Sequence, residues 1–326
     1  MVNIYESCHT KNMSSLDTRI RLRLDQKLQQ LNKLRPLNPS QVQKLRGQLE
    51  IEMTYNSNAI EGNSLTLRET YLVLQEGMTI KGKPLKDHLE AKDHKEALDF
   101  LYDLISQNQY TISEHLIRQL HQLVVRETEK EFAGKYRTGS VIIGGADHTP
   151  PDAVDVPRQM DDLVRQFKKN EKQMHPVELA AWFHHMMVYI HPFFDGNGRT
   201  ARLAMNVILM RHGYPLVIIL KNDRKKYYRV LQTADKGKGA PLVLFIAQAV
   251  ERSLDLYLRA FGKSKAGKLL TLAEASRGTS YSPKYLNLLA RAGKIDASKK
   301  GRIWYTTKEA IEGYRKGRLR QRITPN

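Results

Sequence analysis

The chain has 326 residues and a mass of 37.5 kDa, and 41% of its residues are apolar. No apolar run reaches the roughly 18–20 residues of a membrane span, and no secretory signal is visible. We therefore expect a cytoplasmic protein without a membrane partner. Cys8 is the only cysteine, which excludes an internal disulfide and a cysteine-based zinc cluster. The net charge is +19, and residues 262–326 alone contain 16 Lys/Arg against 4 Asp/Glu. This bias indicates that the C-terminal residues bind nucleic acid, or it serves only the solubility of the chain.

Apolar residues at three- and four-residue spacing predict a mostly helical chain. A capping box at 66–69 opens one of these helices, and Gly77 closes it. In chain order the helices are expected over 17–34, 39–56, 67–76, 85–105, 113–125, 156–168, 176–190, 198–212 and 242–260.

Two stretches depart from this pattern. Residues 134–151 (GKYRTGSVIIGGADHTPP) hold a short β-branched run between glycines and prolines, which predicts a short hairpin or extended flap. Residues 262–268 (GKSKAGK) have the composition of a linker, and a compact basic module follows to about residue 318.

The segment most informative about chemistry is HPFFDGNGRTAR, residues 191–202. His191 falls on the buried stripe of the preceding helix, and Pro192 ends that helix, so an imidazole should face inward beside a loop. Gly196 and Gly198 leave backbone N–H groups accessible at the start of the next helix, where anions bind.

Charged side chains around this turn suit a phosphorylated ligand. Arg199 and Arg202 lie three residues apart in the first helical turns, so both can reach phosphates from one side. Asp195 offers the hard oxygen that Mg²⁺ prefers when it bridges phosphates. The combination predicts a nucleoside-triphosphate site with a built-in base.

Other interpretations of this stretch fit less well. The GNGRTA run mimics a dinucleotide-binding fingerprint, but that fingerprint follows a strand, whereas a helix precedes it here. His184 and His185 lack the spacing of a zinc motif with His191, so we interpret them as core histidines. The remaining alternative is a simple turn between two helices, with a core histidine and two surface arginines. In that case the occurrence of all these residues together would be a coincidence.

The twelve residues match HPFx[DE]GNGRxxR, the signature of the Fic (filamentation induced by cAMP) family, at every defined position. The resemblance covers roughly residues 49–260, including the flap and the stretch 223–231. It implies an all-α fold and an enzyme that transfers AMP from ATP to a hydroxyl of a protein side chain, releasing pyrophosphate.

The resemblance also implies roles for single residues. His191 would take the proton from a Ser, Thr or Tyr of a target protein, or of the chain itself, and Asp195 would hold Mg²⁺. The implied ATP-binding residues are Gly196, Asn197, Gly198, Arg199, Arg202, Tyr227, Tyr228 and Asp235.

Some of these assignments have structural alternatives. Tyr227 and Tyr228 would lie near the adenine or serve as core residues, and Asp235 departs from the amide side chain often found at its position. The flap would pair with a target segment through backbone groups, or form a purely structural hairpin. Its predicted target-binding residues are Val141, Ile142, Ile143 and Gly144.

A second motif, SNAIEGN at residues 57–63, resembles the family's inhibitory sequence [ST]xxxE[GN]. Ser57 and Glu61 share one helical face, and Arg202 is the expected partner of Glu61. That pair would take Arg202 away from the γ-phosphate. Without the signature, the same residues would indicate an ordinary helix end capped by Gly62 and Asn63.

The C-terminal module resembles the winged helix-turn-helix of MerR- and excisionase-like proteins. Ser282 and Pro283 predict the start of its second helix. The residues placed for DNA contact are Lys284, Tyr285, Arg291, Lys299, Lys300 and Arg302. A module for protein contact or dimerisation is the alternative.

These observations predict an all-α Fic core with a short β-hairpin flap and a small C-terminal winged helix. The expected regions are 1–110 with the inhibitory motif, 111–261 as catalytic core and 268–320 as winged module. The leading function is an autoinhibited, Mg²⁺-dependent protein adenylyltransferase. Alternatives are a hydrolase that removes AMP and a DNA-binding regulator that senses nucleotide through the core; a homodimer is compatible with each.

Overall fold

The computed structural model describes residues 16–107, 111–144, 147–262, 269–277 and 279–323. Its backbone contacts divide into two compact units, one containing Pro36–Ser253 and the other combining Leu16–Arg35 with the chain from Leu254 onward. Residues 16–35 therefore group with the C-terminal residues, whereas the sequence-based division assigned them to the N-terminal helical region.

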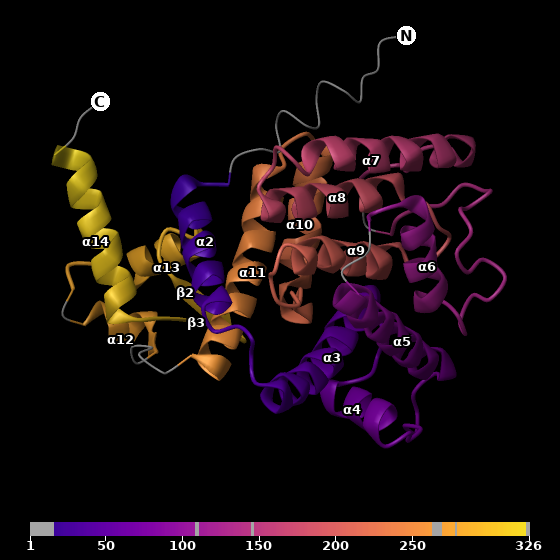
Figure 1. Ribbon diagram of the computed structural model, residues 1–326, viewed down its shortest axis with the longest axis horizontal. Coiled ribbons are helices and arrows are strands. Elements are labelled where there is room, and N and C mark those ends of the chain that lie inside the picture. The colour runs from indigo at the N-terminus through magenta and orange to yellow at the C-terminus, as the bar shows by residue number, and fades with distance from the viewer. Residues whose placement is uncertain (1–15, 108–110, 145–146, 263–268, 278, 324–326) are drawn as a thin grey trace, which may run out of the picture. The chain divides into compact units, whose positions relative to one another are not determined.

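The first unit is built from helices, as predicted (Figure 1). Its α-helices are α3 (Pro39–Glu61), α4 (Leu67–Gln75), α5 (Leu85–Gln107), α6 (Glu114–Val124), α7 (Val156–Asn170), α8 (Pro176–Ile190), α9 (Asn197–Arg211), α10 (Arg224–Asp235) and most of α11 (Ala240–Phe261), with short 3₁₀ turns at Ala153–Asp155 and Lys221–Asp223.

Helices α8 and α9 form the centre of this unit. Helix α8 is apolar around nearly its whole circumference, and most residues of both helices are buried, so both need neighbours on every side. Helix α7 packs on α8, while α5 and α6 pack on α9, and Figure 1 shows α7, α8 and α9 as stacked rows. The loop of residues 191–196 is therefore held at both ends by the core.

The helix ends follow the predicted cap chemistry. Thr66 Oγ1 accepts the Glu69 N–H at 3.2 Å, and the Glu69 carboxylate accepts the Thr66 N–H at 2.7 Å, which confirms the capping box. Helix α3 runs five residues beyond its predicted end and stops where Gly62 takes a φ of +109°. The segment from Ser57 to Glu61 is therefore the last turn of α3.

Residues 134–151 were predicted to form a short hairpin or an extended flap; the hairpin is wrong, because no strand occurs in the described part of this segment, which is a loop without a strand partner. The segment is held by other contacts: the carbonyls of Gly139 and Pro151 accept hydrogen bonds from the Arg137 guanidinium. The Arg137 N–H donates to Pro192 O at 2.9 Å. The Ile142 side chain is 96% exposed in the resulting loop.

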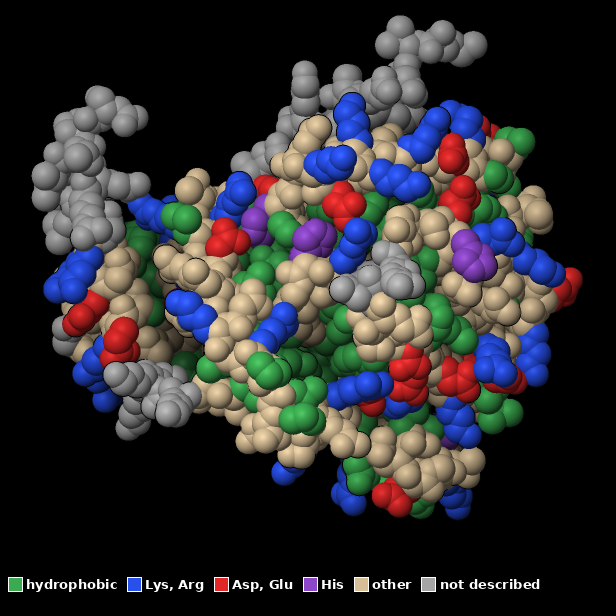
Figure 2. All heavy atoms as spheres, in the orientation of Figure 1, with side chains coloured by type: hydrophobic (Ala, Val, Ile, Leu, Met, Phe, Trp, Pro, Cys, Tyr) green, Lys and Arg blue, Asp and Glu red, His purple; other side chains and the backbone are tan. Residues whose placement is uncertain are grey.

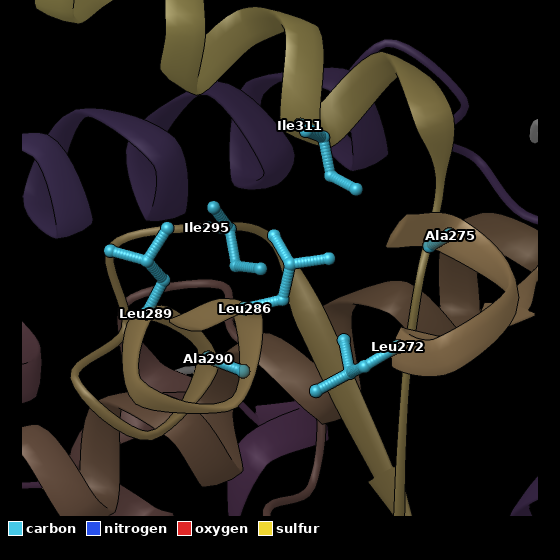
Figure 3. Close-up of a cluster of buried hydrophobic side chains, with 7 residues drawn as sticks. All are labelled: Leu272, Ala275, Leu286, Leu289, Ala290, Ile295 and Ile311. Carbon is cyan, nitrogen blue, oxygen red and sulfur yellow. The ribbon is translucent and has the colours of Figure 1, made fainter. Parts of the chain in front are cut away.

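The second unit contains α2 (Thr18–Asn32), the end of α11, and the elements of the C-terminal module: β1 (Leu270–Thr271), α12 (Leu272–Ser276), α13 (Pro283–Arg291), β2 (Ala297–Lys300), β3 (Ile303–Thr306) and α14 (Lys308–Ile323). The strands form an antiparallel sheet in the order β1-β3-β2. Seven apolar side chains from α12, α13, α14 and the loop after α13 close over one another in Figure 3, so this module has its own small core.

Across the described residues, we find no helix whose length and apolar character would allow it to span a bilayer.

Candidate active site

The site is the loop between α8 and α9, where His191 caps the end of α8. His191 has a φ of +50° and is the only non-glycine with positive φ among the described residues. Pro192 prevents the helical conformation at His191, so the chain turns sharply there. The left-handed conformation places the imidazole at the helix end, as the sequence predicted.

The His191 ring is oriented by a backbone carbonyl. Its Nδ1 lies 3.3 Å from Val188 O, and because a carbonyl only accepts, Nδ1 carries the proton. Nε2 then keeps its lone pair. Burial, reinforced by the Arg137 cation, lowers the pKa of His191 to about 4, so the imidazole is neutral at pH 7 and able to accept a proton.

The rest of the loop is closed by its own polar groups. Asn197 Oδ1 accepts the Phe193 N–H at 2.9 Å, and Asn197 Nδ2 donates to Phe193 O at 2.8 Å. Phe193 is fully buried and stacks on His121 at 3.6 Å. Gly196 has a φ of +74°, and a Cβ there would lie 2.8 Å from a Val125 methyl, so only glycine fits.

Asp195 and Arg199 form a charged cluster at the start of α9. Asp195 Oδ1 accepts the Gly196 N–H at 2.6 Å and lies 3.3 Å from Arg199 Nη2, while Oδ2 lies 3.5 Å from Lys86 Nζ. Burial opposes ionisation, but Arg199, the Gly196 N–H and Lys86 together lower the pKa of Asp195. Arg199 also lies 3.3 Å from Glu90, and its own side chain is buried.

Arg202 is bound to the last turn of α3, as predicted. Its Nη2 lies 2.7 Å from Glu61 Oε1, and its Nε and Nη2 donate to Ser57 Oγ and Ser57 O at 3.0 and 2.8 Å. A Cβ at Gly198 would collide with Glu61 Oε1, so the carboxylate lies directly against the glycine-rich turn. Glu61 therefore occupies the place where an anion would meet the amides at the start of α9.

Arg137 was not identified from the sequence, although it connects the flap to the loop. Its guanidinium is buried and donates to His191 O at 2.8 Å, to Gly139 O at 3.0 Å and to Pro151 O. On the flap, His148 Nε2 donates to Tyr189 O at 2.8 Å while the two rings stack. Backbone carbonyls occur at every residue, so the sequence carries no signal for these bonds.

The residues predicted near the adenine lie at different depths. Tyr227 is buried, and its hydroxyl lies 2.9 Å from His184 Nε2. Asp235 Oδ1 lies 2.8 Å from His185 Nε2, which accounts for an acidic side chain at this position. Both histidines are fully buried, in agreement with their interpretation as core residues.

Tyr228 lies closer to the C-terminal end of α3. Its hydroxyl donates to Ile60 O at 3.3 Å, and Arg224 Nε donates to the same carbonyl at 2.6 Å. The last carbonyls of a helix lack partners within the helix, so these two side chains satisfy the end of α3.

The residues predicted to contact DNA differ in how exposed their side chains are. Lys284, Arg291 and Arg302 have exposed side chains and Lys299 is half-buried, whereas the Lys300 side chain lies outside the described residues. Tyr285 packs against the core of the C-terminal module, with its hydroxyl 3.4 Å from Tyr314 Oη.

Comparison with known proteins agrees with this geometry. A model described as the Fic/DOC family matches residues 111–209. A solved Fic domain containing signaling protein from Bacteroides thetaiotaomicron is 30% identical, with a TM-score of 0.67; the match covers 75% of this chain and 99% of that one. The chain belongs to the Fic/DOC family.

Other Fic relatives support the same assignment. Fic-1 from C. elegans is 32% identical with a TM-score of 0.68, over 77% of this chain and 74% of that one. A curated "Protein adenylyltransferase Fic" from Nematostella vectensis is 41% identical over 205 residues, which is 63% of this chain and 48% of the relative. The chain spans about half the length of the curated relatives it matches.

Asp195 is the Fic signature residue that could hold a metal ion together with a nucleotide. No group of three or more His, Cys, Asp or Glu side chains that could hold a metal ion occurs in the described ranges. Mg²⁺ often needs only one or two carboxylates in addition to phosphates and water, and the partly exposed Asp195 meets that requirement. Arg202 Nη1 is buried without a hydrogen-bond partner among the described residues, as expected of a donor that awaits an anion.

The Fic core should lose stability in mild acid because it buries neutral histidines. Burial, with the nearby Arg202 cation, lowers the pKa of both His94 and His184 to about 3. Below pH 6.5 the unfolded chain binds protons that the folded chain does not, so each histidine costs about 1.4 kcal/mol per pH unit as pH falls. Urea unfolding between pH 7 and 5 should give a free energy of unfolding that falls less steeply with decreasing pH in His94→Gln than in the parent chain. Equal steepness in the variant and the parent would contradict the assignment.

Proposed function

We propose that this chain transfers AMP from ATP to a hydroxyl of a protein side chain and that Glu61 inhibits the transfer. The observation that carries the proposal is the contact of Glu61 with Arg202 and Gly198, beside the neutral His191. Relatives named "Protein adenylyltransferase Fic" support the type of reaction. A cytoplasmic location is part of the proposal and agrees with the single cysteine.

In this reaction the hydroxyl oxygen of the target attacks the α-phosphorus, and pyrophosphate leaves with the electrons of the broken P–O bond. His191 Nε2 accepts the hydroxyl proton, since Nδ1 is committed to Val188 O. The amides at the start of α9, with Arg199 and Arg202, bind the phosphates and fix their orientation. Bound at Asp195, Mg²⁺ would neutralise phosphate charge.

Target binding is assigned to the flap, from Val141 to Gly144. This segment has no strand partner in the described structure, so its backbone groups are available to an extended peptide. The target is a protein with a Ser, Thr or Tyr at the site of attack, and the chain itself is one such substrate. Tyr227, Tyr228 and Asp235 are proposed to line the region around the base.

Mass spectrometry of the full chain with ATP and Mg²⁺ tests the proposal. An added adenylyl group on the chain or on an added protein, absent without ATP, is the expected result. The absence of any adduct, both in the parent chain and after Glu61 is replaced by glycine, would contradict the proposal.

A second candidate is removal of AMP from modified protein. The Glu61 side chain is one-third exposed and lies against the glycine-rich turn, so its carboxylate can activate water next to a bound phosphate. This activity predicts release of AMP from an AMP-modified protein by the parent chain and loss of release in Glu61→Gln. Persistent release in Glu61→Gln would exclude Glu61 as the base.

DNA binding by the C-terminal module is a third candidate, favoured by its order of elements and by the exposed Lys284 and Arg302. On the face shown in Figure 2, Lys and Arg side chains are dispersed and do not gather into one patch. We expect a duplex-DNA mobility shift that weakens steeply with salt and is reduced in Lys284→Ala with Arg302→Ala. No shift at low salt would favour a protein-contact role for the module.

A further inference from the structure

Glu90 belongs neither to the signature nor to the inhibitory sequence, yet it lies against a signature arginine. Its Oε1 is 3.3 Å from Arg199 Nη1, and the two side chains are 10% and 1% exposed. Arg199 Nη1 makes no hydrogen bond with acceptable geometry among the described residues, so its contact with Glu90 is an ion pair. The Nη1 hydrogens can therefore still be donated to a further acceptor. A carboxylate this deeply buried is costly unless it is paired, which makes Arg199 its necessary partner.

The other groups of Glu90 are bound to the inhibitory segment. Glu90 Oε2 accepts from Asn63 Nδ2 at 2.8 Å, and the Glu90 backbone carbonyl accepts from Asn58 Nδ2 at 3.2 Å. Asn58 and Asn63 lie on either side of Glu61 in the sequence. The inhibitory segment therefore contacts Arg202 directly through Glu61, and it is connected to Arg199 only by way of Glu90.

The two carboxylates on Arg199 differ in what they can do when a nucleotide binds. Asp195 is 42% exposed and is the proposed Mg²⁺ ligand, so its contact with Arg199 is exchangeable. Glu90 comes from α5, is buried, and is bound by Asn63 as well as by Arg199, so we expect it to stay in place. Of the two, only Glu90 can hold the guanidinium while phosphates occupy the site.

We propose that Glu90 is a positioning residue that fixes the Arg199 guanidinium for the leaving phosphates, and that Asn63 orients the Glu90 carboxylate. This inference rests on the proposed function. Removing the Glu90 charge takes one negative charge away from the phosphate site, so ATP affinity should not fall. The loosened guanidinium should instead slow the chemical step.

The first test does not require transfer activity. In the full chain with ¹⁵N-labelled arginine, the two Nη groups of a fixed guanidinium give separate NMR signals, which Arg199→Lys assigns. Glu90→Gln should lower the temperature at which the Arg199 signals merge. Glu50→Gln is the matched control, because Glu50 is also buried and ion-paired, with Arg46 and Lys95. Unchanged Arg199 signals in Glu90→Gln would overturn the proposal.

The second test uses the full chain with Glu61→Gly, in which inhibition is removed. Adding Glu90→Gln should lower kcat for AMP transfer about tenfold without raising KM for ATP. Glu50→Gln should leave kcat unchanged. A raised KM with unchanged kcat, or the same loss in Glu50→Gln, would overturn the positioning role.

Two outcomes separate this inference from the proposed function. If the Glu61→Gly chain transfers no AMP, the proposed function fails and the NMR result alone decides the role of Glu90. If Glu90→Gln does not fold, Asn63→Ala replaces it, because it removes the donor to Glu90 Oε2. Asn63→Ala should lower kcat and should lower the temperature at which the Arg199 signals merge, as expected for Glu90→Gln. No change in either quantity would overturn the proposal.

Discussion

Replacing Glu61 by glycine is expected to raise ATP-dependent labelling about 10- to 100-fold. The carboxylate accepts from a buried guanidinium, and a hydrogen bond to a charged group contributes roughly 1.5–3 kcal/mol, which corresponds to that factor. Glycine removes this bond and also clears the space at Gly198 that Glu61 Oε1 fills. Adenylyl incorporation over time, followed by mass spectrometry, measures the effect.

Charge and bulk can be separated with a second substitution. Glu61→Gln keeps the size of the side chain but removes its charge, so it should give an increase smaller than that of glycine. Glu52→Gln, nine residues earlier in α3 and without a contact to Arg202, should label like the parent. Labelling of Glu61→Gly at the parent rate would show that the last turn of α3 does not inhibit.

His191→Ala should reduce transfer by about 10²- to 10⁴-fold, the usual contribution of a positioned general base. The change is best made in the active Glu61→Gly chain, where the loss is measured against a strong signal. Alanine is less favourable than histidine at a φ of +50°, but the hydrogen bond from Arg137 to the carbonyl of residue 191 uses only the backbone, so the loop should keep its shape. Stabilisation by Mg²⁺ and ATP in thermal unfolding should persist, because phosphate binding does not use the imidazole.

His212 provides the control for this loss. It ends α9 with its Nδ1 2.8 Å from Ile208 O, a bond of the same kind as that between His191 and Val188, but remote from the glycine-rich turn. His212→Ala should therefore keep full transfer. If the His191→Ala chain labelled as well as its parent, another group would have to accept the proton.

The helices and the loop were predictable because their signals are local. Periodicity, caps and Pro192 define α8, the turn and α9, and the pairing of Glu61 with Arg202 followed from two short motifs. The hairpin prediction was wrong because the β-branched residues Val141–Ile143 express only a local preference, whereas the described part of the segment is held by contacts of Arg137 with Gly139 and Pro151 that the local sequence does not indicate.

Other parts of the site depend on contacts between distant segments. Glu90 is a charged residue on the buried face of α5, and the sequence does not show which cation it meets. Helix α10 was not predicted as a helix, although its tyrosines had been singled out. Its Tyr228, together with Arg224, binds the end of α3 through a single carbonyl, which no residue pattern records.

The Arg137 guanidinium has a consequence for fidelity. One planar cation binds the carbonyl of His191 and two carbonyls of the flap. The surface that would receive a polypeptide and the group that would accept its proton are therefore held by the same side chain. A polypeptide bound one residue out of register would present its hydroxyl several ångströms from the imidazole. The connection through Arg137 leaves the flap and the loop little freedom to move and correct this. Choice of the modified residue would then be set at docking, before any bond is made.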